Sequence, residues 1–391
     1  MRSAAVSRRA LLAAPAAAWL QPASIDISAA IPAGNIIVEG IRAGEALIRQ
    51  DLRDTAGDWF WWCFEVRGAG AQTVRFRFTG SNVIGTRGPA VSTGGGLNWH
   101  WLGRGAVEGQ TFVYHFDPRV PAVRFAFAIP YTERDLARFL NGRRGIRTEA
   151  LCQTNKGRTA ERLRFGASSP GAVKVLLTAR HHCCECTASY ALEGLIEAAL
   201  DDRWLRANAA FAAIPFVDKD GVEDGDQGKN RRPRDHNRDY DGACVHPTVR
   251  AIRQWTPVWS AGRLAFALDL HCPWIRGQHN EDIYFPGGEE PRNWREITTF
   301  AGILEKLNEG PLPYSVKNNI PFGTAWNTAA NYQQGMSFAR WAAGLQGVRA
   351  AGAIEIPYAN CGAVDVTPAA ARALGHSLAA ALRQYLRGPG V

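Results

Sequence analysis

Two histidines and two glutamates of this sequence are spaced as the ligands and the proton carrier of a metal site would be. His182 and Glu185 form a His-x-x-Glu motif, a spacing that lets an imidazole and a carboxylate reach one metal ion from a single tight turn. His271 and Glu355 follow much later in the chain. Two imidazoles and one carboxylate are the ligand set of a catalytic zinc that keeps its fourth position for water. A second carboxylate beside such a centre can carry a proton as general base and then as general acid.

The chain around these residues predicts the strands that would position them. Val173–Ala179 is a near-continuous apolar run that ends just before the His-x-x-Glu motif. Arg263–Leu270 is a second run and delivers His271 at its end. Ala353–Tyr358 is a third run and contains Glu355. Such runs are typical of strands buried in a parallel sheet. Because ligands in open α/β sheets bind beyond the carboxyl ends of the strands, we expect these residues to meet at one sheet edge.

Glu355 is predicted to bind protons more readily than an exposed glutamate. It stands between Ile354 and Ile356, and an apolar environment disfavours the charged carboxylate. A raised affinity for protons suits general acid–base work. The alternative is a strand carboxylate that pairs with a lysine or an arginine.

A polar motif, Asp-His-Asn-Arg at positions 235–238, lies between the first two predicted strands. Asn237 and Arg238 place a guanidinium beside an amide donor, which is one way for a protein to hold a carboxylate. The alternative is a mixed-charge surface loop, because residues 229–234 read Lys-Asn-Arg-Arg-Pro-Arg. Acidic residues between positions 218 and 226 balance these cations, which argues against a nucleic-acid patch.

Composition limits the classes of protein to which the chain can belong. Its 391 residues suffice for two domains, or for one large domain with additions. The formal charge is +9, and three of the arginines lie in an N-terminal stretch that we expect to be removed. The remaining excess is too modest to argue for nucleic acid as a partner. We find no apolar stretch long enough to cross a bilayer, so no stable membrane anchor is predicted.

Residues 1–24 are interpreted as an export signal. Ser-Arg-Arg-Ala-Leu-Leu at positions 7–12 resembles a twin-arginine motif, and positions 11–20 supply a short apolar segment. The alternative is a disordered, alanine-rich N-terminus. The signal predicts a periplasmic or secreted protein exported by the twin-arginine route. Eight cysteines are tolerable in such an oxidising compartment, but they do not form the dense pattern of a disulfide scaffold.

Two domains are predicted after this leader. Residues 31–145 read mostly as strands, among them 74–78, 111–116 and 122–129, and suggest a small antiparallel β-sandwich. A short helix with Thr132 as N-cap is expected near its end. Residues 146–391 alternate apolar strands with helices, which indicates an α/β domain with a mixed, mostly parallel sheet flanked by helices. A last amphipathic helix is predicted to begin at Thr367-Pro368.

The ordered motifs carry a family resemblance. They are Arg180-x-His182-x-x-Glu185, Asp220-Gly221-Val222, Asp235-x-Asn237-Arg238, Asp269-Leu270-His271 and Glu355-Ile356-Pro357-Tyr358. Together they resemble the zinc carboxypeptidases of the carboxypeptidase A superfamily, in particular the cytosolic-carboxypeptidase-like branch, which carries a β-sandwich ahead of the catalytic domain. The resemblance covers roughly residues 31–391.

The resemblance implies a zinc enzyme that removes the C-terminal residue of peptides or proteins. His182, Glu185 and His271 would bind one Zn²⁺ ion. Asp235 would accept the free ring N–H of a ligand histidine and so fix its tautomer. Glu355 would take a proton from the attacking water and deliver it to the leaving amine.

The same resemblance assigns the groups that would hold the substrate. Asn237 and Arg238 would grip its terminal carboxylate. Tyr332 lies about where the family keeps a tyrosine that closes over the substrate. Arg340 lies in the range of the side-chain pocket and would suit an acidic C-terminal residue. The alternative for Arg340 is an arginine on the exposed face of a helix.

The sequence departs from the family at two places. Gly228 stands where the branch keeps an arginine that stabilises the tetrahedral oxyanion. Lys229, Arg231 or Arg232 could replace it, and we favour Arg231 or Arg232. Cys183-Cys184 replaces the family's Pro-Gly between the ligands. These cysteines are small residues that fill a tight turn or, alternatively, a thiolate or disulfide near the metal.

Two other functions remain open at this stage. One is a zinc deacylase or amidase of the aspartoacylase type, acting on N-acyl amino acids. The other is a non-catalytic, zinc-holding binding module. The retained Glu355 argues against a binding module, which needs no proton carrier, whereas the missing arginine at position 228 argues for it. The oligomeric state is not predicted.

Overall fold

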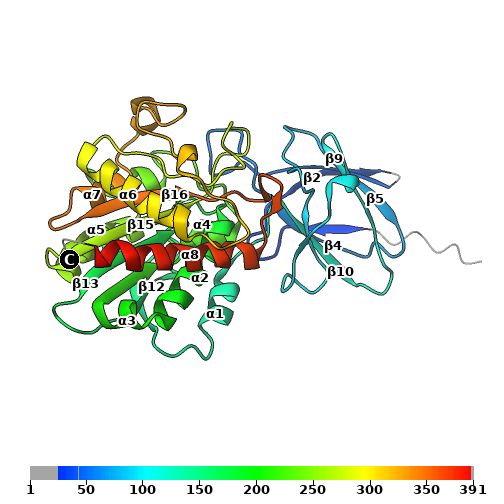
Figure 1. The fold of residues 1–391 in the computed structure, drawn as a ribbon. Helices are drawn as coiled ribbons and strands as arrows, with labels where there is room; N and C mark the ends of the chain where they lie inside the picture. The colour runs from blue at the N-terminus through cyan, green and yellow to red at the C-terminus, as the bar shows by residue number, and fades with distance from the viewer. Residues whose placement is uncertain (1–24, 43, 389–391) are drawn as a thin grey trace, which may run out of the picture.

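The computed structural model describes residues 25–42 and 44–388. The predicted export signal lies outside the described residues. Figure 1 shows an α/β part on the left and a β-sheet part on the right, which lie side by side. Within the described residues no helix is long and apolar enough to cross a membrane.

Two five-stranded sheets form the β part, in the orders β1-β4-β10-β6-β7 and β2-β3-β5-β9-β8. Their strands are β1 (Asp26–Ser28), β2 (Ile37–Arg42), β3 (Glu45–Arg49), β4 (Cys63–Arg67), β5 (Thr73–Phe78), β6 (Ala90–Ser92), β7 (His100–Trp101), β8 (Val107–Glu108), β9 (Thr111–His115) and β10 (Ala122–Ala126). Neighbouring strands are antiparallel, except that β3 and β5 are parallel.

An aromatic core holds the two five-stranded sheets together. In β5, buried and exposed residues alternate as predicted, and Phe76 faces inward. Its ring centroid lies 5.5 Å from that of Phe64 in β4 and 5.3 Å from that of Phe125 in β10. Because β4 and β10 belong to the opposite sheet, these contacts bury apolar surface between the two layers.

A six-stranded sheet forms the centre of the α/β part, in the order β11-β12-β14-β13-β15-β16. Its strands are β11 (Arg147–Gln153), β12 (Thr159–Gly166), β13 (Val173–Ala179), β14 (Ala209–Ile214), β15 (Leu264–His271) and β16 (Ala350–Glu355). The four strands β14, β13, β15 and β16 are parallel, and β11 and β12 add antiparallel pairs. The predicted mixed, mostly parallel sheet is therefore confirmed. A short ribbon of β17 (Asn360–Cys361) and β18 (Val364–Asp365) follows.

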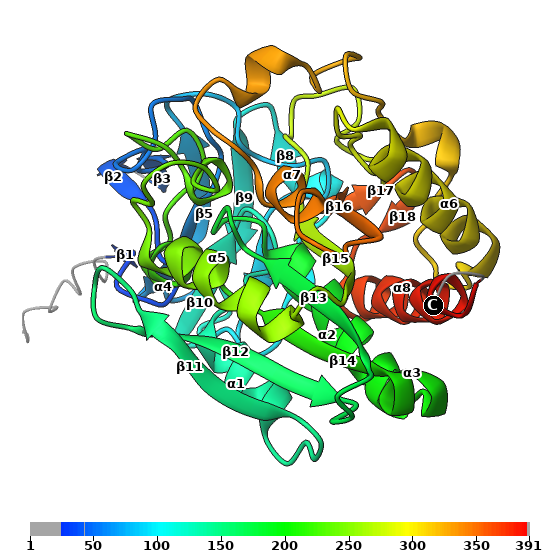
Figure 2. The same cartoon turned by 90° about the vertical axis from the view of Figure 1, so that its left-hand side faces the viewer.

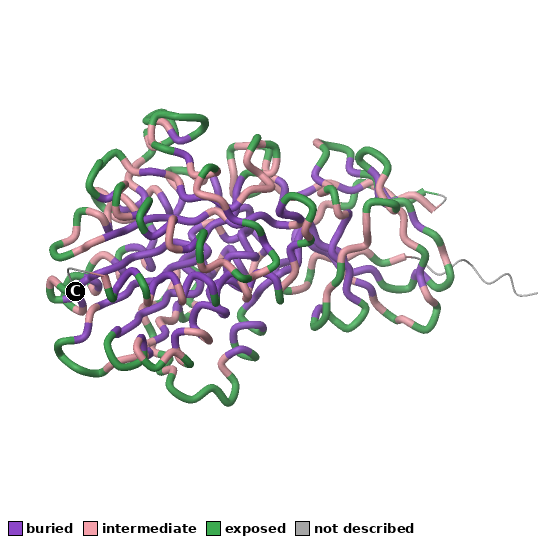
Figure 3. The backbone as a smooth tube through the Cα atoms, in the orientation of Figure 1, coloured by how far each residue is buried: buried purple, intermediate pink, exposed green. Residues whose placement is uncertain are grey.

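Helices flank the sheet and can be followed in Figures 1 and 2. They are α1 (Glu133–Leu140), α2 (Cys186–Asp201), α3 (Arg203–Asn208), α4 (Lys219–Asp224), α5 (Pro247–Ser260), α6 (Pro291–Leu307), α7 (Phe338–Ala343) and α8 (Pro368–Arg387). Residues of α2, α6 and α8 share one apolar core with Val175 and Leu177 of β13, whereas α5 and α7 share a second core with Leu176. Successive residues of β13 thus face opposite layers, which explains the unbroken apolar run. Figure 3 shows these central strands as buried.

The predicted elements compare closely with the observed ones. β13 has the predicted bounds, and β15 ends one residue later than predicted. Thr367 accepts a hydrogen bond from the amide of Ala370 and caps α8, as its sequence indicates. β16 begins and ends three residues earlier than predicted. The strand stops at Glu355 because Pro357 has no amide hydrogen to extend the ladder.

Candidate metal centre and its cleft

The residues predicted to do chemistry come together at the carboxyl ends of three adjacent parallel strands. The His-x-x-Glu motif follows β13, and His271 is the last residue of β15. Glu355 is the last residue of β16 and stands directly opposite His271 in the strand register. Sheet pairing therefore fixes the spacing of groups that are far apart in the sequence.

A tight turn between β13 and α2 presents the first two groups. Arg180 begins it with φ of 62°, a left-handed conformation that costs energy outside glycine. Its buried guanidinium donates hydrogen bonds to the carbonyl oxygens of Cys183 and Tyr131, each at 2.9 Å. These bonds hold the turn, and Glu185 then immediately precedes α2.

Three side chains converge on one point. The Glu185 carboxylate lies between two imidazoles, with Oε1 2.9 Å from Nδ1 of His182 and Oε2 2.7 Å from Nδ1 of His271. The potential ligand atoms of the three residues lie within 4.8 Å of one another. Their donor types fit a zinc ion, for which neutral imidazole and carboxylate are ordinary ligands.

Each of the two imidazoles has a carboxylate on its far nitrogen. Nε2 of His182 lies 3.7 Å from Oδ1 of Asp235, and Nε2 of His271 lies 2.5 Å from Oδ2 of Asp269. The contact of Asp269 is short enough for a hydrogen bond, and a carboxylate in this position fixes the tautomer and the ring orientation of a metal-binding histidine. The arrangement leaves both Nδ1 atoms facing Glu185, which supports the fit to a metal ion.

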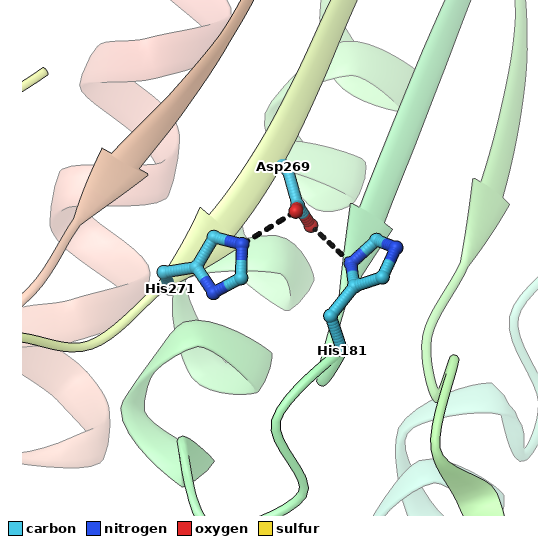
Figure 4. Close-up of side chains that lie close together, drawn as sticks. All are labelled: His181, Asp269 and His271. Carbon is cyan, nitrogen blue, oxygen red and sulfur yellow. Dashed lines mark hydrogen bonds and ion pairs between the residues drawn. The ribbon is translucent and has the colours of Figure 1, made fainter. Parts of the chain in front are cut away.

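A second group of potential ligands shares His271 and consists of His181, Asp269 and His271 (Figure 4). Asp269 lies between the two rings, with Oδ1 2.8 Å from Nδ1 of His181. The other ring nitrogen of His181 lies 2.8 Å from the Tyr240 hydroxyl. His181 is fully buried and does not line the cleft over these groups, whereas His182 and His271 do. The group around Glu185 is therefore the better metal centre.

Burial and neighbouring charges shift the pKa values of the acidic groups. Burial raises the pKa of Glu355 above its ordinary value; His271 opposes this shift and Glu185 adds to it. Oε2 of Glu355 is also buried without a hydrogen-bond partner among the described residues. Burial alone would raise the pKa of Glu185, but Lys229 and the two histidines hold it well below its ordinary value. Glu185 thus stays a carboxylate, whereas Glu355 is suited to accept a proton.

A cleft of about 840 Å³ opens over these groups. Its lining includes His182, His271 and Glu355, and also four residues predicted to hold the substrate, namely Asn237, Arg238, Tyr332 and Arg340. The Tyr332 ring centroid lies 4.9 Å from the guanidinium of Arg238 and 5.3 Å from that of Arg340. The structure therefore brings the predicted substrate-binding residues to the same cleft as the metal centre.

The two arginines favoured as oxyanion donors do not line the cleft. Arg231 forms ion pairs with three carboxylates, to Asp54 at 3.0 Å, Asp218 at 2.9 Å and Asp226 at 3.0 Å. Arg232 is exposed on the surface. These carboxylates, one from the β part and two that flank α4, thus hold Arg231 away. The sequence indicated a balance between the cations and the acidic residues at 218–226, but it gave no sign of the partner from the β part.

Lys229 and Asp269 are closer to the metal centre than sequence reasoning indicated. Nζ of Lys229 lies 2.7 Å from Oε1 of Glu185, and Lys229 lines the cleft. For Lys229, the available signal was its position directly after Gly228, where the family resemblance predicts an arginine. For Asp269, the signal was a charged residue in an otherwise apolar strand two positions before a ligand histidine.

The cysteines of the turn are free thiols. Cys183, Cys184 and Cys186 are buried, and every cysteine in the described part of the chain is unpaired. Burial raises the pKa of Cys184 to about 12, so the sulfur stays protonated at neutral pH. The geometry agrees with small residues that fill a tight turn.

Comparison with solved structures shows which fold this is. A metallo-carboxypeptidase from Burkholderia cenocepacia is similar over 93% of this chain and 99% of its own, with a TM-score of 0.71 and 18% identity. A metallo-carboxypeptidase from Pseudomonas aeruginosa, in complex with (2-guanidinoethylmercapto)succinic acid, is similar over 92% and 99%, with a TM-score of 0.71 and 21% identity. The chain has the metallo-carboxypeptidase fold.

Sequence comparison points the same way. No family model matches the chain. Cytosolic carboxypeptidase 6 of Caenorhabditis elegans is 30% identical over 158 residues, which is 37% of this chain and 34% of that protein. An uncharacterized protein of Zymomonas mobilis is 26% identical over 266 residues, 63% of this chain and 67% of that protein. The chain is carboxypeptidase-like, and it spans about a third of the length of the named carboxypeptidase.

Proposed function

We propose that this protein is a zinc-dependent metallocarboxypeptidase that hydrolyses the C-terminal peptide bond of peptides or proteins. The observation that carries the proposal is the convergence of His182, Glu185 and His271 beside Glu355, in one cleft with Asn237 and Arg238. A metal centre and a carboxylate-binding pair in the same cleft are what a C-terminal peptidase requires. Export by the twin-arginine route is part of the proposal and rests on the sequence of residues 1–24.

His182, Glu185 and His271 would hold the zinc ion. A zinc ion bound there supplies Lewis acidity and lowers the pKa of a coordinated water. The chain's own contribution is to fix His271 through Asp269 before the metal arrives, while Asp235 stands near the far nitrogen of His182.

Glu355 would move the proton. Its half-buried carboxylate accepts a proton from the attacking water and delivers it to the leaving nitrogen, so that one group serves as base and then as acid. Arg238 and Asn237 would hold the substrate's terminal carboxylate by charge-assisted hydrogen bonds. Only a chain with a free C-terminus would then place its last peptide bond at Glu355.

An assay of paired substrates tests the proposal. The zinc-loaded protein should release the last residue from an N-blocked dipeptide and leave an N-acetyl amino acid intact, and a chelator should abolish the release. Glu355→Gln should lose about 10²-fold or more in kcat while binding zinc with unchanged stoichiometry. Hydrolysis of the N-acetyl amino acid alone would instead indicate a deacylase. Zinc binding without hydrolysis of either would indicate a binding module.

Arg340 would select the C-terminal residue of the substrate. It lines the cleft, but its guanidinium forms an ion pair with Glu289, which lines the cleft as well. We expect Arg340→Ala to lower the preference for C-terminal Glu over Leu and Glu289→Ala, the matched variant, to raise it. A C-terminal peptide library read by mass spectrometry measures both. An unchanged ratio of Glu to Leu in Arg340→Ala would refute the assignment.

A further inference from the structure

Three lysine or arginine side chains line the cleft among the residues that the structure describes, and each of them has a partner within the protein. Arg238 donates hydrogen bonds to the carbonyl oxygens of Asn237, at 2.9 Å, and Asn331, at 3.1 Å. Arg340 is paired with Glu289. Both guanidinium groups also flank Tyr332. The third cation, Lys229, is the one beside the metal centre.

Lys229 is held from two sides. Its Nζ atom lies 2.7 Å from Oε1 of Glu185 and 3.5 Å from the carbonyl oxygen of Cys272. It also lies 5.1 Å from the ring centroid of Trp59, which contributes a cation–π contact from the β part. The residue is buried and yet lines the cleft. An ammonium group is thus fixed next to the carboxylate that bridges both ligand histidines.

The loop of this protein does not accommodate an arginine at position 228. Gly228 has φ of 77°, and a Cβ atom there would lie 2.4 Å from the backbone nitrogen of Cys183. The loop after α4 therefore needs glycine at that position to pack against the turn between β13 and α2, which carries His182 and Glu185 and which we call the ligand turn. The next residue in the chain is Lys229, and its long side chain reaches the cleft instead.

We propose that Lys229 is the cation that stabilises the oxyanion formed during hydrolysis, an inference that rests on the proposed function. In the first step the water oxygen bonds to the carbonyl carbon, the π electrons move to the carbonyl oxygen, and a water proton passes to Glu355. In the second step those electrons reform the carbonyl while the C–N bond breaks and the nitrogen takes the proton. Lys229 faces the negative charge that exists only between the two steps.

A purely structural role is the competing explanation. Lys229 could serve only as the counter-ion that keeps Glu185 ionised. In that case its loss would weaken zinc binding and would affect all ligands of the cleft alike. An oxyanion role instead predicts a loss confined to the transition state, with the substrate bound as before.

Lys229→Met separates the two roles, because methionine keeps much of the length and removes the charge. The zinc-loaded protein would be assayed with an N-blocked dipeptide. Binding of its phosphonate analogue, in which a tetrahedral phosphorus replaces the scissile carbonyl carbon, would be measured by calorimetry. Zinc content would be determined for each variant. Lys229→Arg tests rescue by a longer cation, and Lys317→Met is the control at an exposed lysine outside the cleft.

The inference predicts a fall in kcat of about 10²–10³-fold with KM changed only a few-fold, and a similar loss of affinity for the phosphonate. Zinc content should stay that of the wild type, and Lys229→Arg should recover part of kcat. Unchanged phosphonate binding, or a loss of activity that only follows lost zinc, would overturn it. If the wild-type protein released no residue from any peptide, the proposed function itself would be overturned. If the wild type is active and only the results for Lys229→Met disagree, the role of Lys229 alone is refuted.

Discussion

Asp269 connects two histidines through one carboxylate. Its Oδ2 atom contacts the metal-binding candidate His271, and its Oδ1 atom contacts both His181 and the hydroxyl of Thr178, each at 2.8 Å. An acceptor with two oxygens can serve all three groups, whereas an amide would turn one of its donors toward a histidine or toward Thr178.

We therefore expect Asp269→Asn to lower zinc affinity by about 10–100-fold, which is the usual effect of removing a carboxylate that hydrogen-bonds a metal-binding histidine. Competition with a chromophoric chelator measures the affinity. Tyr240→Phe is the matched control, because it removes the hydroxyl at the other nitrogen of His181 without touching His271. Equal zinc affinities of Asp269→Asn and the wild type would show that the carboxylate does not orient the ligand.

Individual site residues differ in how readily the sequence reveals them. His182 closely follows one apolar run and His271 closes another, so the strand pattern alone places these two at one sheet edge. Glu355 lies within the third predicted run, and only the earlier end of β16 places it at the same edge. The contact of Lys229 with Glu185 depends on how the loop after α4 folds back onto the ligand turn, which no local pattern encodes. The same is true of Arg231, whose partner Asp54 comes from the β part.

At the scale of elements, the loop after α4 and the turn after β13 form one packed unit. The Cys183 thiol donates a hydrogen bond to the carbonyl oxygen of Asp226, at 2.9 Å. The amide of Gly228 donates to Asp54, at 2.8 Å. Displacement of the loop at Gly228 would therefore displace the ligand turn.

Gly228→Ala should destabilise the protein by about 2 kcal/mol or more, because it adds a left-handed alanine and a contact with Cys183 that is too short. Denaturant unfolding measures this cost, and zinc content should fall with it. Gly85→Ala is the control, since a Cβ atom there meets nothing within 4 Å. Similar free energies of unfolding for the two variants would contradict the packing argument.

The ends of helices and strands could be predicted where capping or polar residues mark them. Thr367-Pro368 marks the start of α8, and the polar residues after Ala179 end β13. For β16 the predicted run begins at Ala353 and leaves out the small residues Ala-Ala-Gly at 350–352. Small residues are needed there because Gly352 packs against Ile297 of α6.

At the scale of the whole molecule, polar contacts join the β part to the α/β part. Arg53 donates a hydrogen bond to Asp226 at 2.8 Å, and Asn35 donates one to the carbonyl oxygen of Gly225, also at 2.8 Å. Burial raises the pKa of Asp226 to about 6, and the nearby Asp54 adds to the shift. Asp226 is thus a titrating group at the junction of the two parts.

The sign of its contribution follows from this shift. Between pH 4 and 6 the folded protein holds a proton on Asp226 that the unfolded chain has released, so this group's contribution to stability falls as the pH rises through that window. Asp226→Asn should abolish this fall in the free energy of unfolding, which is on the order of 2 kcal/mol across the window. Denaturant midpoints at several pH values between 4 and 7 measure it, with the exposed Asp201→Asn as control. Parallel pH profiles for Asp226→Asn and the wild type would refute the prediction.

The Trp59 indole, which stands against Lys229 in the wall of the cleft, has a practical consequence for engineering. A shortened version that begins at α1 would retain every candidate zinc ligand and still lack the indole that lines the cleft beside Lys229. If the first 126 residues were exchanged for those of a relative, the contact with Lys229 would be kept only if the relative also has an aromatic ring at the position of Trp59. The β part thus contributes directly to the wall of the cleft through Trp59 and is more than an appendage.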